Sequence, residues 1–168
     1  MEKKELYIGI DPGVTGAIAV IDGECRCLYL NDCPTEKSTR KSSRKIVSAI
    51  GITNIIKEIK GLKGRCQALL EEPIAMPREG RTMGAVSMLS YGRGVGIWEG
   101  ALSTYGIKYY TVMPRVWKKE LLNSSDKREA VKTARKLFPE YKKKLIKTKH
   151  GRAEALLIAY YLLFGGVK

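Results

Sequence analysis

The stretch YIGIDPGVTGAIAVID, residues 7–22, constrains the fold of this chain more than any other part of the sequence. It reads as two apolar strands separated by Asp11 and a Pro-Gly pair, and Pro-Gly is a strong turn signal. The Asp-Gly pair at 22–23 is a hairpin signal that leads into another strand. We therefore expect an antiparallel meander of three strands, over 5–11, 17–22 and 25–31.

The rest of the chain alternates between helical and extended patterns. The polar segment 34–45 predicts a loop. Helices are expected over 45–60, 83–104, from a capping box at Asp126 and Glu129 to about 137, and over 152–164. Two more strands are expected over 66–72 and 107–112. This order predicts an α/β protein with a mixed five-stranded sheet flanked by helices, in one domain over 1–168.

Two features of the sequence indicate the cellular location of the protein and the chemical state of its cysteines. No apolar run approaches the length of a membrane helix, and the N-terminus shows no signal segment, so we expect a cytoplasmic protein without a membrane partner. The four cysteines lack the spacing and the neighbouring histidine of a zinc site, which favours reduced thiols over the zinc alternative.

The net charge of +14, from 31 basic and 17 acidic residues, indicates a polyanionic partner. The basic residues cluster in 37–45 and 142–149 rather than mixing with acids, as a merely solubilising surface would. Neither cluster has the pattern of a membrane-surface helix, so nucleic acid is favoured over an anionic membrane.

Three acids stand in places that each allow an ordinary explanation. Asp11 could cap its own turn, Glu71 could be a solvated residue at a strand end, and Glu154 could favour the positive end of a helix. Together they suggest more, because carboxylates at strand ends share one sheet edge over which a helix start can dock. Three converging acids repel unless a cation neutralises them, and oxygen ligands suit Mg²⁺ or Mn²⁺. His150, four residues before Glu154, could be a further ligand, a proton-transfer group or a surface residue.

At this point the residues resemble the RuvC-type Holliday junction resolvases of the ribonuclease H-like superfamily. IGIDPGVTGAIAVID looks like the first two strands of that family, LLEEP like its second acidic strand, and HGRAEALLIAYYL like its last helix. The segments MPRVWKKEL and SSDKREAVKTARKLFP resemble the part between them. The likeness covers nearly the whole chain and is closest to compact phage-type members, which would place the protein in a bacterial host cytoplasm.

The resemblance implies site residues position by position. Asp11 matches the first metal ligand, Glu71 the second in preference to Glu72, and Glu154 a position where the family most often has aspartate. His150 lies one residue upstream of the usual fourth ligand. Lys127 matches a lysine near the scissile phosphate, and Lys118 is a weaker match of the same kind.

The family's activity implies a homodimer that binds a four-way DNA junction and nicks two strands symmetrically, leaving 5′-phosphate ends that a ligase can seal. Two Mg²⁺ or Mn²⁺ ions per site, and no nucleotide cofactor, are expected. The helix over 83–104 corresponds to the family's dimer contact.

The residues themselves supply candidate DNA contacts. Ile74 and Met76 could wedge into an opened base step, or pack their loop onto the core. The basic candidates are Lys37, Arg40, Lys41, Arg44, Lys45, Arg78, Arg81, Arg93, Lys118, Lys142, Lys143, Lys144, Lys147 and Lys149.

Three alternatives stay open. IGIDPGVTGA also resembles the phosphate-binding hairpin of actin-like ATPases and sugar kinases, but those proteins need two such domains and 168 residues hold one. A junction-binding protein without cleavage is the second alternative. A nuclease for other branched DNA or for RNA hybrids is the third.

Overall fold

The apolar strand that ends at Asp11 lies at the centre of the sheet. The computed structural model describes residues 4–39, 44–72, 84–122, 127–146 and 150–166. Within them, β1 (Glu5–Asp11) pairs antiparallel with β2 (Ala17–Asp22), which pairs antiparallel with β3 (Cys27–Asp32). On its other side β1 pairs parallel with β6 (Arg65–Glu71), and β6 pairs parallel with β7 (Lys108–Val112). The order β3-β2-β1-β6-β7 confirms the predicted mixed five-stranded sheet.

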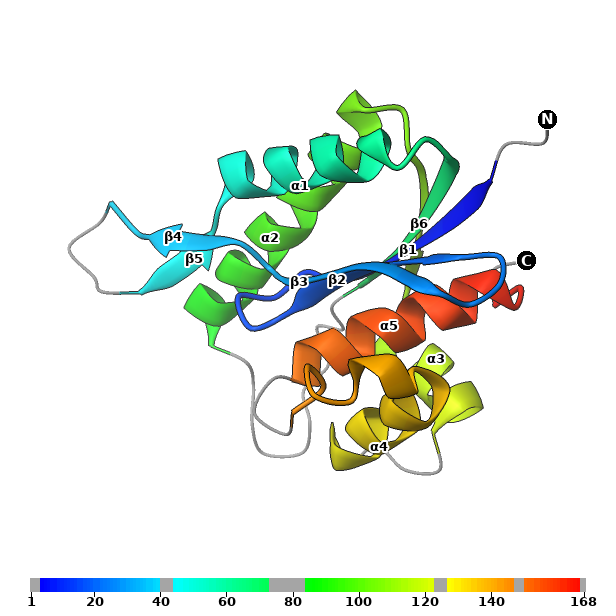
Figure 1. The fold of residues 1–168 in the computed structure, drawn as a ribbon. Helices are drawn as coiled ribbons and strands as arrows, with labels where there is room; N and C mark the ends of the chain where they lie inside the picture. Colours follow the sequence, from blue (N-terminus) through cyan, green and yellow to red (C-terminus); the bar gives the residue numbers. More distant parts are fainter. Residues whose placement is uncertain (1–3, 40–43, 73–83, 123–126, 147–149, 167–168) are drawn as a thin grey trace.

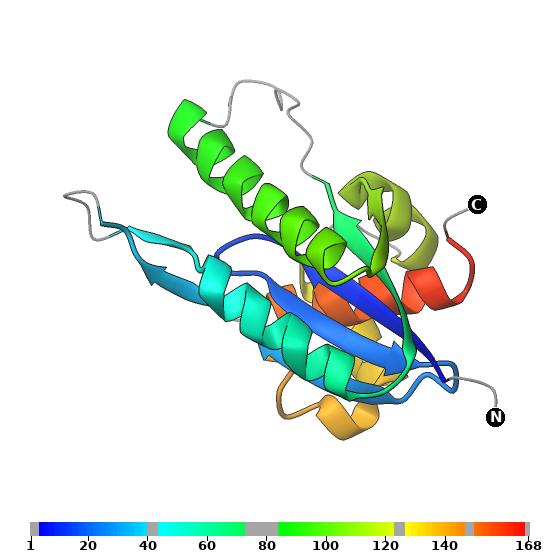
Figure 2. The same ribbon diagram turned by 90° about the horizontal axis from the view of Figure 1, so that it is seen from above.

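Two helices cover one face of this sheet, α1 (Ala49–Gly61) and α2 (Ala85–Thr104) (Figures 1 and 2). The alternation along β1 sends Leu6, Ile8 and Ile10 into the core on this side, where they pack in one cluster with the isoleucines of α1 and with Trp98 of α2. The α2 helix crosses close to the turn after β1, because a side chain at Gly94 would meet the carbonyl oxygen of Pro12 at 2.8 Å.

The opposite face is covered by α3 (Pro114–Leu121), α4 (Lys127–Leu137), the short 3₁₀ helix η1 (Pro139–Tyr141) and α5 (His150–Leu163) (Figure 1). The last helix is buried along most of its length, as its apolar sequence predicts. It lies directly on β1 at Gly9, where any side chain would collide with the backbone of Ala155 and Ala159. Among the described residues, no helix is long and apolar enough to span a bilayer.

Three local predictions need correction. The segment expected as a loop contains a hairpin, β4 (Thr35–Lys37) with β5 (Lys45–Val47), which forms its own two-stranded sheet. The helix expected from residue 45 begins only at Ala49, because Lys45–Val47 are extended and Ser48 caps the helix by accepting a hydrogen bond from the Gly51 N–H. No helix is predicted at 114–121, where α3 starts with proline in its first turn.

Candidate functional site

Asp11 and Glu71 lie side by side at the carboxyl ends of the neighbouring strands β1 and β6. The parallel register of β1 and β6 places Ile10 opposite Leu70, so the next residue of each strand is a carboxylate. By the alternation of the strands, both acids project to the face that α5 covers. The turn after β1 is shaped around Asp11, whose Oδ1 accepts a hydrogen bond from the Gly13 N–H at 3.3 Å. The predicted convergence of strand-end acids is thus present for this pair.

Glu154 reaches the same region from the first turns of α5. The helix can approach because Gly151 packs against the β1–β2 turn, where an added side chain would come within 2.5 Å of the Thr15 carbonyl oxygen. Glu154 is 7% exposed, and its charge acts on that of Glu71. His150 begins the helix, so it lies one turn before Glu154, as its spacing predicts. Its Nδ1 is buried and has no hydrogen-bond partner in the described part of the chain.

The Glu71 carboxyl is buried and lies close to other acids. It is 6% exposed, and burial, followed by the negative charges of Asp11 and Glu154, raises its pKa to about 7. Lys118 and a hydrogen bond from Trp117 act in the opposite direction. The indole Nε1 of Trp117 donates to Glu71 Oε1 at 2.9 Å and holds the carboxyl in place. Glu72, the alternative acid, is exposed.

Lys118 pairs with Glu154. Its Nζ lies 2.6 Å from Glu154 Oε1, and both side chains are mostly buried. The ammonium of a lysine from α3 therefore neutralises one of the three carboxylates. The sequence gives Lys118 as a candidate DNA contact and as the weaker match to a lysine near the scissile phosphate, and the structure places its ammonium beside Glu154.

Two functional candidates escape the sequence analysis. Tyr91 of α2 lies near the acids, because burial and the charges of Glu71, Asp11 and Glu154 raise its phenol pKa well above the usual range. Trp117 is the other, through its bond to Glu71. The signal for Trp117 is its position inside the quoted MPRVWKKEL segment. No pattern in the glycine-rich helix singles out Tyr91.

The side chains of this site are of the chemical type that binds a hard divalent cation. Three carboxylates offer oxygen ligands, and the buried Nδ1 of His150, which has no hydrogen-bond partner among the described residues, offers a nitrogen. The pKa of Glu71 is raised first by burial and then by the charges of Asp11 and Glu154, and a cation would offset those charges. Across the described ranges, however, no three histidine, cysteine, aspartate or glutamate side chains are arranged to hold one ion. Glu154 instead forms an ion pair with the ammonium of Lys118.

The predicted DNA contacts are only partly placed. Exposed cations are found on the β4–β5 hairpin, on α2 and after α4, namely Lys37, Arg44, Lys45, Arg93, Lys142, Lys143 and Lys144. The side chain of Lys127, whose backbone starts α4, lies outside the description. The other candidates are in undescribed segments: Arg40, Lys41, Ile74, Met76, Arg78, Arg81, Lys147 and Lys149, together with Asp126 of the capping box.

No protein-family model matches this sequence, and a comparison with curated proteins gives no match. Among solved structures, Thermus thermophilus RuvC in complex with a Holliday junction substrate is similar with a TM-score of 0.67 at 19% identity, covering 98% of both chains. A second Thermus thermophilus RuvC structure is similar with a TM-score of 0.56 at 17% identity, covering 95% of this chain and 96% of that one. This chain therefore has a RuvC-type, ribonuclease H-like fold.

Proposed function

We propose that the protein is a structure-selective DNA endonuclease that resolves four-way junctions by symmetric, metal-dependent nicking of two strands. The observation that carries this proposal is the gathering of Asp11, Glu71 and Glu154 at one sheet edge in a chain of net charge +14. The basic surface would attract a polyanion such as DNA, and the cluster of acids would bind the divalent cations that assist its cleavage. The RuvC-type fold, seen in a neighbour bound to a Holliday junction substrate, supports the same conclusion.

Mg²⁺ or Mn²⁺, two per site, would be held by Asp11, Glu71 and Glu154, with His150 as a further ligand. When bound, such ions would supply an activated water and offset the charge on the leaving oxygen of a phosphodiester, which leaves a 5′-phosphate product. The Trp117 indole would orient Glu71 through its 2.9 Å hydrogen bond. Lys118 would neutralise Glu154 in the absence of ions, and Lys127 would lie near the scissile phosphate.

The exposed cations would hold the DNA by its phosphates. Those of the β4–β5 hairpin and of residues 142–144 are exposed, so they would contact phosphates and position the DNA without reading its sequence. Binding of this kind releases counterions and falls steeply as salt is added.

A homodimer formed through α2 would bring two such sites to one symmetric junction. The helix offers an open face, because a Cβ added at Gly92, Gly96 or Gly100 would meet no atom of the described residues within 4 Å. Its first turns carry Val86 and Leu89, which are 61% and 70% exposed. Apolar side chains continuing into a glycine face allow a second helix to approach closely.

Cleavage of a synthetic four-way junction by wild type and Asp11→Asn tests the proposed activity. We expect paired nicks with Mg²⁺ or Mn²⁺, no nicks with EDTA, and no nicks by the variant, which should still bind the junction in a gel-shift assay. Glu72→Asn serves as the matched control, since Glu72 is an exposed acid next to the site, and it should nick like wild type.

Two outcomes would replace the proposal. Tight junction binding without nicks under any metal would show a binding protein, a function that the Lys118–Glu154 ion pair favours because it already neutralises one acid. Nicks in flaps or RNA hybrids but not in four-way junctions would show a nuclease of another selectivity.

A further inference from the structure

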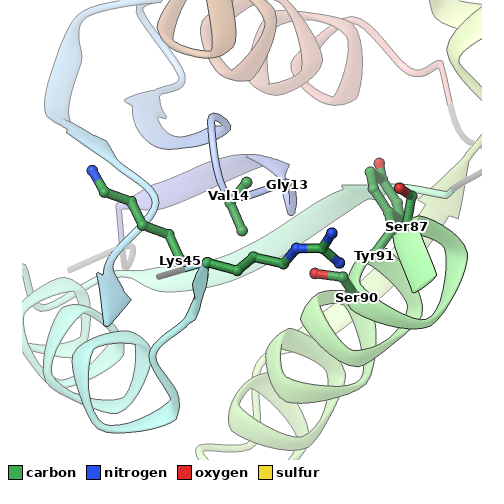
Figure 3. A pocket seen from close by; sticks show the side chains of 7 residues that line it. Gly13, Val14, Lys45, Ser87, Ser90 and Tyr91 are labelled. Atoms are coloured by element: carbon green, nitrogen blue, oxygen red, sulfur yellow. The ribbon is translucent and has the colours of Figure 1, made fainter. Parts of the chain in front are cut away.

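A pocket of about 310 Å³ lies beside the turn that follows Asp11, and two of its lining residues, Arg44 and Lys45, are among the exposed cations proposed above to hold DNA. Its walls come from three elements: the turn after β1 with Gly13 and Val14, the start of the β5 strand with Arg44 and Lys45, and the first turns of α2 with Ser87, Ser90 and Tyr91. Figure 3 shows the serines and Tyr91 on the helix, with Gly13 and Val14 on the turn beside them.

The lining selects an anion with an apolar part. Two cations and three hydroxyl groups line the pocket, and none of its described lining residues carries a carboxylate. The Tyr91 hydroxyl, which lines the pocket, can donate a hydrogen bond. Val14, 39% exposed, adds an apolar surface. Phosphate with an attached sugar and base has this combination of charge, acceptors and apolar faces.

The pocket shares its boundary with the acidic site. Gly13 lines the pocket and donates a hydrogen bond from its N–H to Asp11. Tyr91 also lines the pocket, and the charges of all three acids contribute to raising its phenol pKa. A ligand in the pocket is therefore a direct neighbour of whatever lies at Asp11. The volume is at the lower end of the roughly 300–1,000 Å³ typical of small-molecule sites, which suits one nucleotide and excludes a duplex.

We infer that this pocket binds one unpaired nucleotide of the DNA strand that is cleaved, adjacent to the scissile phosphate. Arg44 and the α2 serines contact its phosphate, and Val14 with the Tyr91 ring contacts its base or sugar. This inference rests on the proposed nuclease function. Taking a nucleotide out of a stack costs a few kcal/mol and costs least where pairing is already broken, so the pocket would favour branch points over intact duplex.

The test uses a four-way junction in which the nucleotides flanking the nick are replaced, one at a time, by the fluorescent base 2-aminopurine, whose emission rises on unstacking. The full-length Asp11→Asn protein binds it without cleavage. Two variants alter the pocket in that background: Ser90→Trp fills it, and Arg44→Gln removes a lining cation. Arg65→Gln is the matched control, since it removes an exposed cation at the far end of β6. Thermal unfolding verifies that each variant is folded.

We expect one flanking position to brighten with the parent protein and with Arg65→Gln. In both pocket variants the ratio of unstacked to stacked nucleotide that the emission reports should fall about tenfold, roughly 1.4 kcal/mol. Unchanged brightening with Ser90→Trp, or no bright position on a bound junction, would overturn the inference. If the junction is not bound at all, the proposed function has failed. The pocket is then judged on a short single strand containing 4-thiothymidine, whose crosslinks must fall on Val14 or on Ser87–Tyr91; crosslinks confined to other segments overturn it.

Discussion

Burial opposes the ionisation of the Glu71 carboxyl. Its side chain is enclosed between the sheet and α3, and two further carboxylates act on it, so its pKa rises to about 7. A carboxyl with this pKa is half protonated near neutral pH. Without a divalent cation the site therefore lowers the stability of the fold, and the protein retains it at that cost.

Glu71→Gln should remove a pH dependence of stability. The unfolded chain releases the Glu71 proton near 4.5, whereas the folded protein keeps it up to about pH 7. The folded state thus binds more protons between these values, and the free energy of unfolding falls as pH rises through them. In EDTA near pH 4, the free energy of unfolding of the variant should equal that of wild type or lie below it. Near pH 8 it should exceed that of wild type by roughly 1–3 kcal/mol. Urea unfolding across this range measures it, with Glu72→Gln as the control, and parallel curves for all three proteins would contradict it.

Lys118→Gln should destabilise the metal-free protein. The substitution leaves Glu154, only 7% exposed, without the ammonium that lies 2.6 Å away. Removing one partner of a fully buried pair costs about 3–5 kcal/mol, and partial exposure of the lysine reduces this to roughly 1–3 kcal/mol. Urea unfolding in EDTA at neutral pH measures the loss. Lys119→Gln, its exposed neighbour, should change little, and equal stability of the two variants would disprove the role of the pair.

At the scale of the elements, the site depends on how closely α5 lies on β1 and on the turn after it. Gly9 and Gly151 are the contact points, because at both positions a Cβ would overlap backbone atoms of the other element. Backbone cannot move aside as a flexible side chain can. These glycines set the distance from Glu154 to Asp11 and Glu71.

Gly9→Ala should therefore shift α5 and weaken the site. Overpacking of this kind costs about 1–3 kcal/mol or more, and junction nicking should fall with it because Glu154 moves. Gly61→Ala is the control, since an added side chain there meets nothing within 4 Å. Thermal unfolding and nicking rates measure both effects. A Gly9→Ala protein as stable and as active as the Gly61→Ala protein would refute the close contact.

At the scale of the whole molecule, the two faces of α2 have opposite roles. Gly94 faces inward and admits the carbonyl oxygen of Pro12, whereas Gly92, Gly96 and Gly100 lie on an open face. Three exposed glycines lower the intrinsic stability of one helix by roughly 0.5–1 kcal/mol each relative to alanine. A second copy of the helix packed against them would offset that cost.

Gly96→Leu should separate the proposed dimer into folded monomers. Within one chain, a Cβ at this position meets no described atom within 4 Å, so we expect the thermal stability of the monomer not to fall. Between two chains the leucine would hold the helices apart. Sedimentation or light scattering gives the mass, and Gly61→Leu, a substitution at another open glycine, should remain a dimer. A monomeric wild type, or a Gly96→Leu dimer, would exclude an interface on this face.

Local patterns account for most of the elements and for the three acids. Consecutive residues carry the apolar runs of β1 and β2, the acid at the end of β6 and the apolar length of α5, so these features can be predicted without coordinates. The β4–β5 hairpin was missed because it is short and polar, and its position is settled by contacts such as the bond from Ser48 Oγ to Glu36 Oε2.

The sequence by itself determined the mixed sheet, the basic character and the identity of Asp11, Glu71 and Glu154 as candidates, because each depends on residue type and local period. Only the tertiary structure decided that Trp117 holds Glu71, that Lys118 neutralises Glu154 and that Tyr91 faces both the acids and a pocket. These contacts join residues far apart in the chain. They follow from the angle and distance at which α2, α3 and α5 pack on the sheet, and those are set by the whole core rather than by any one segment.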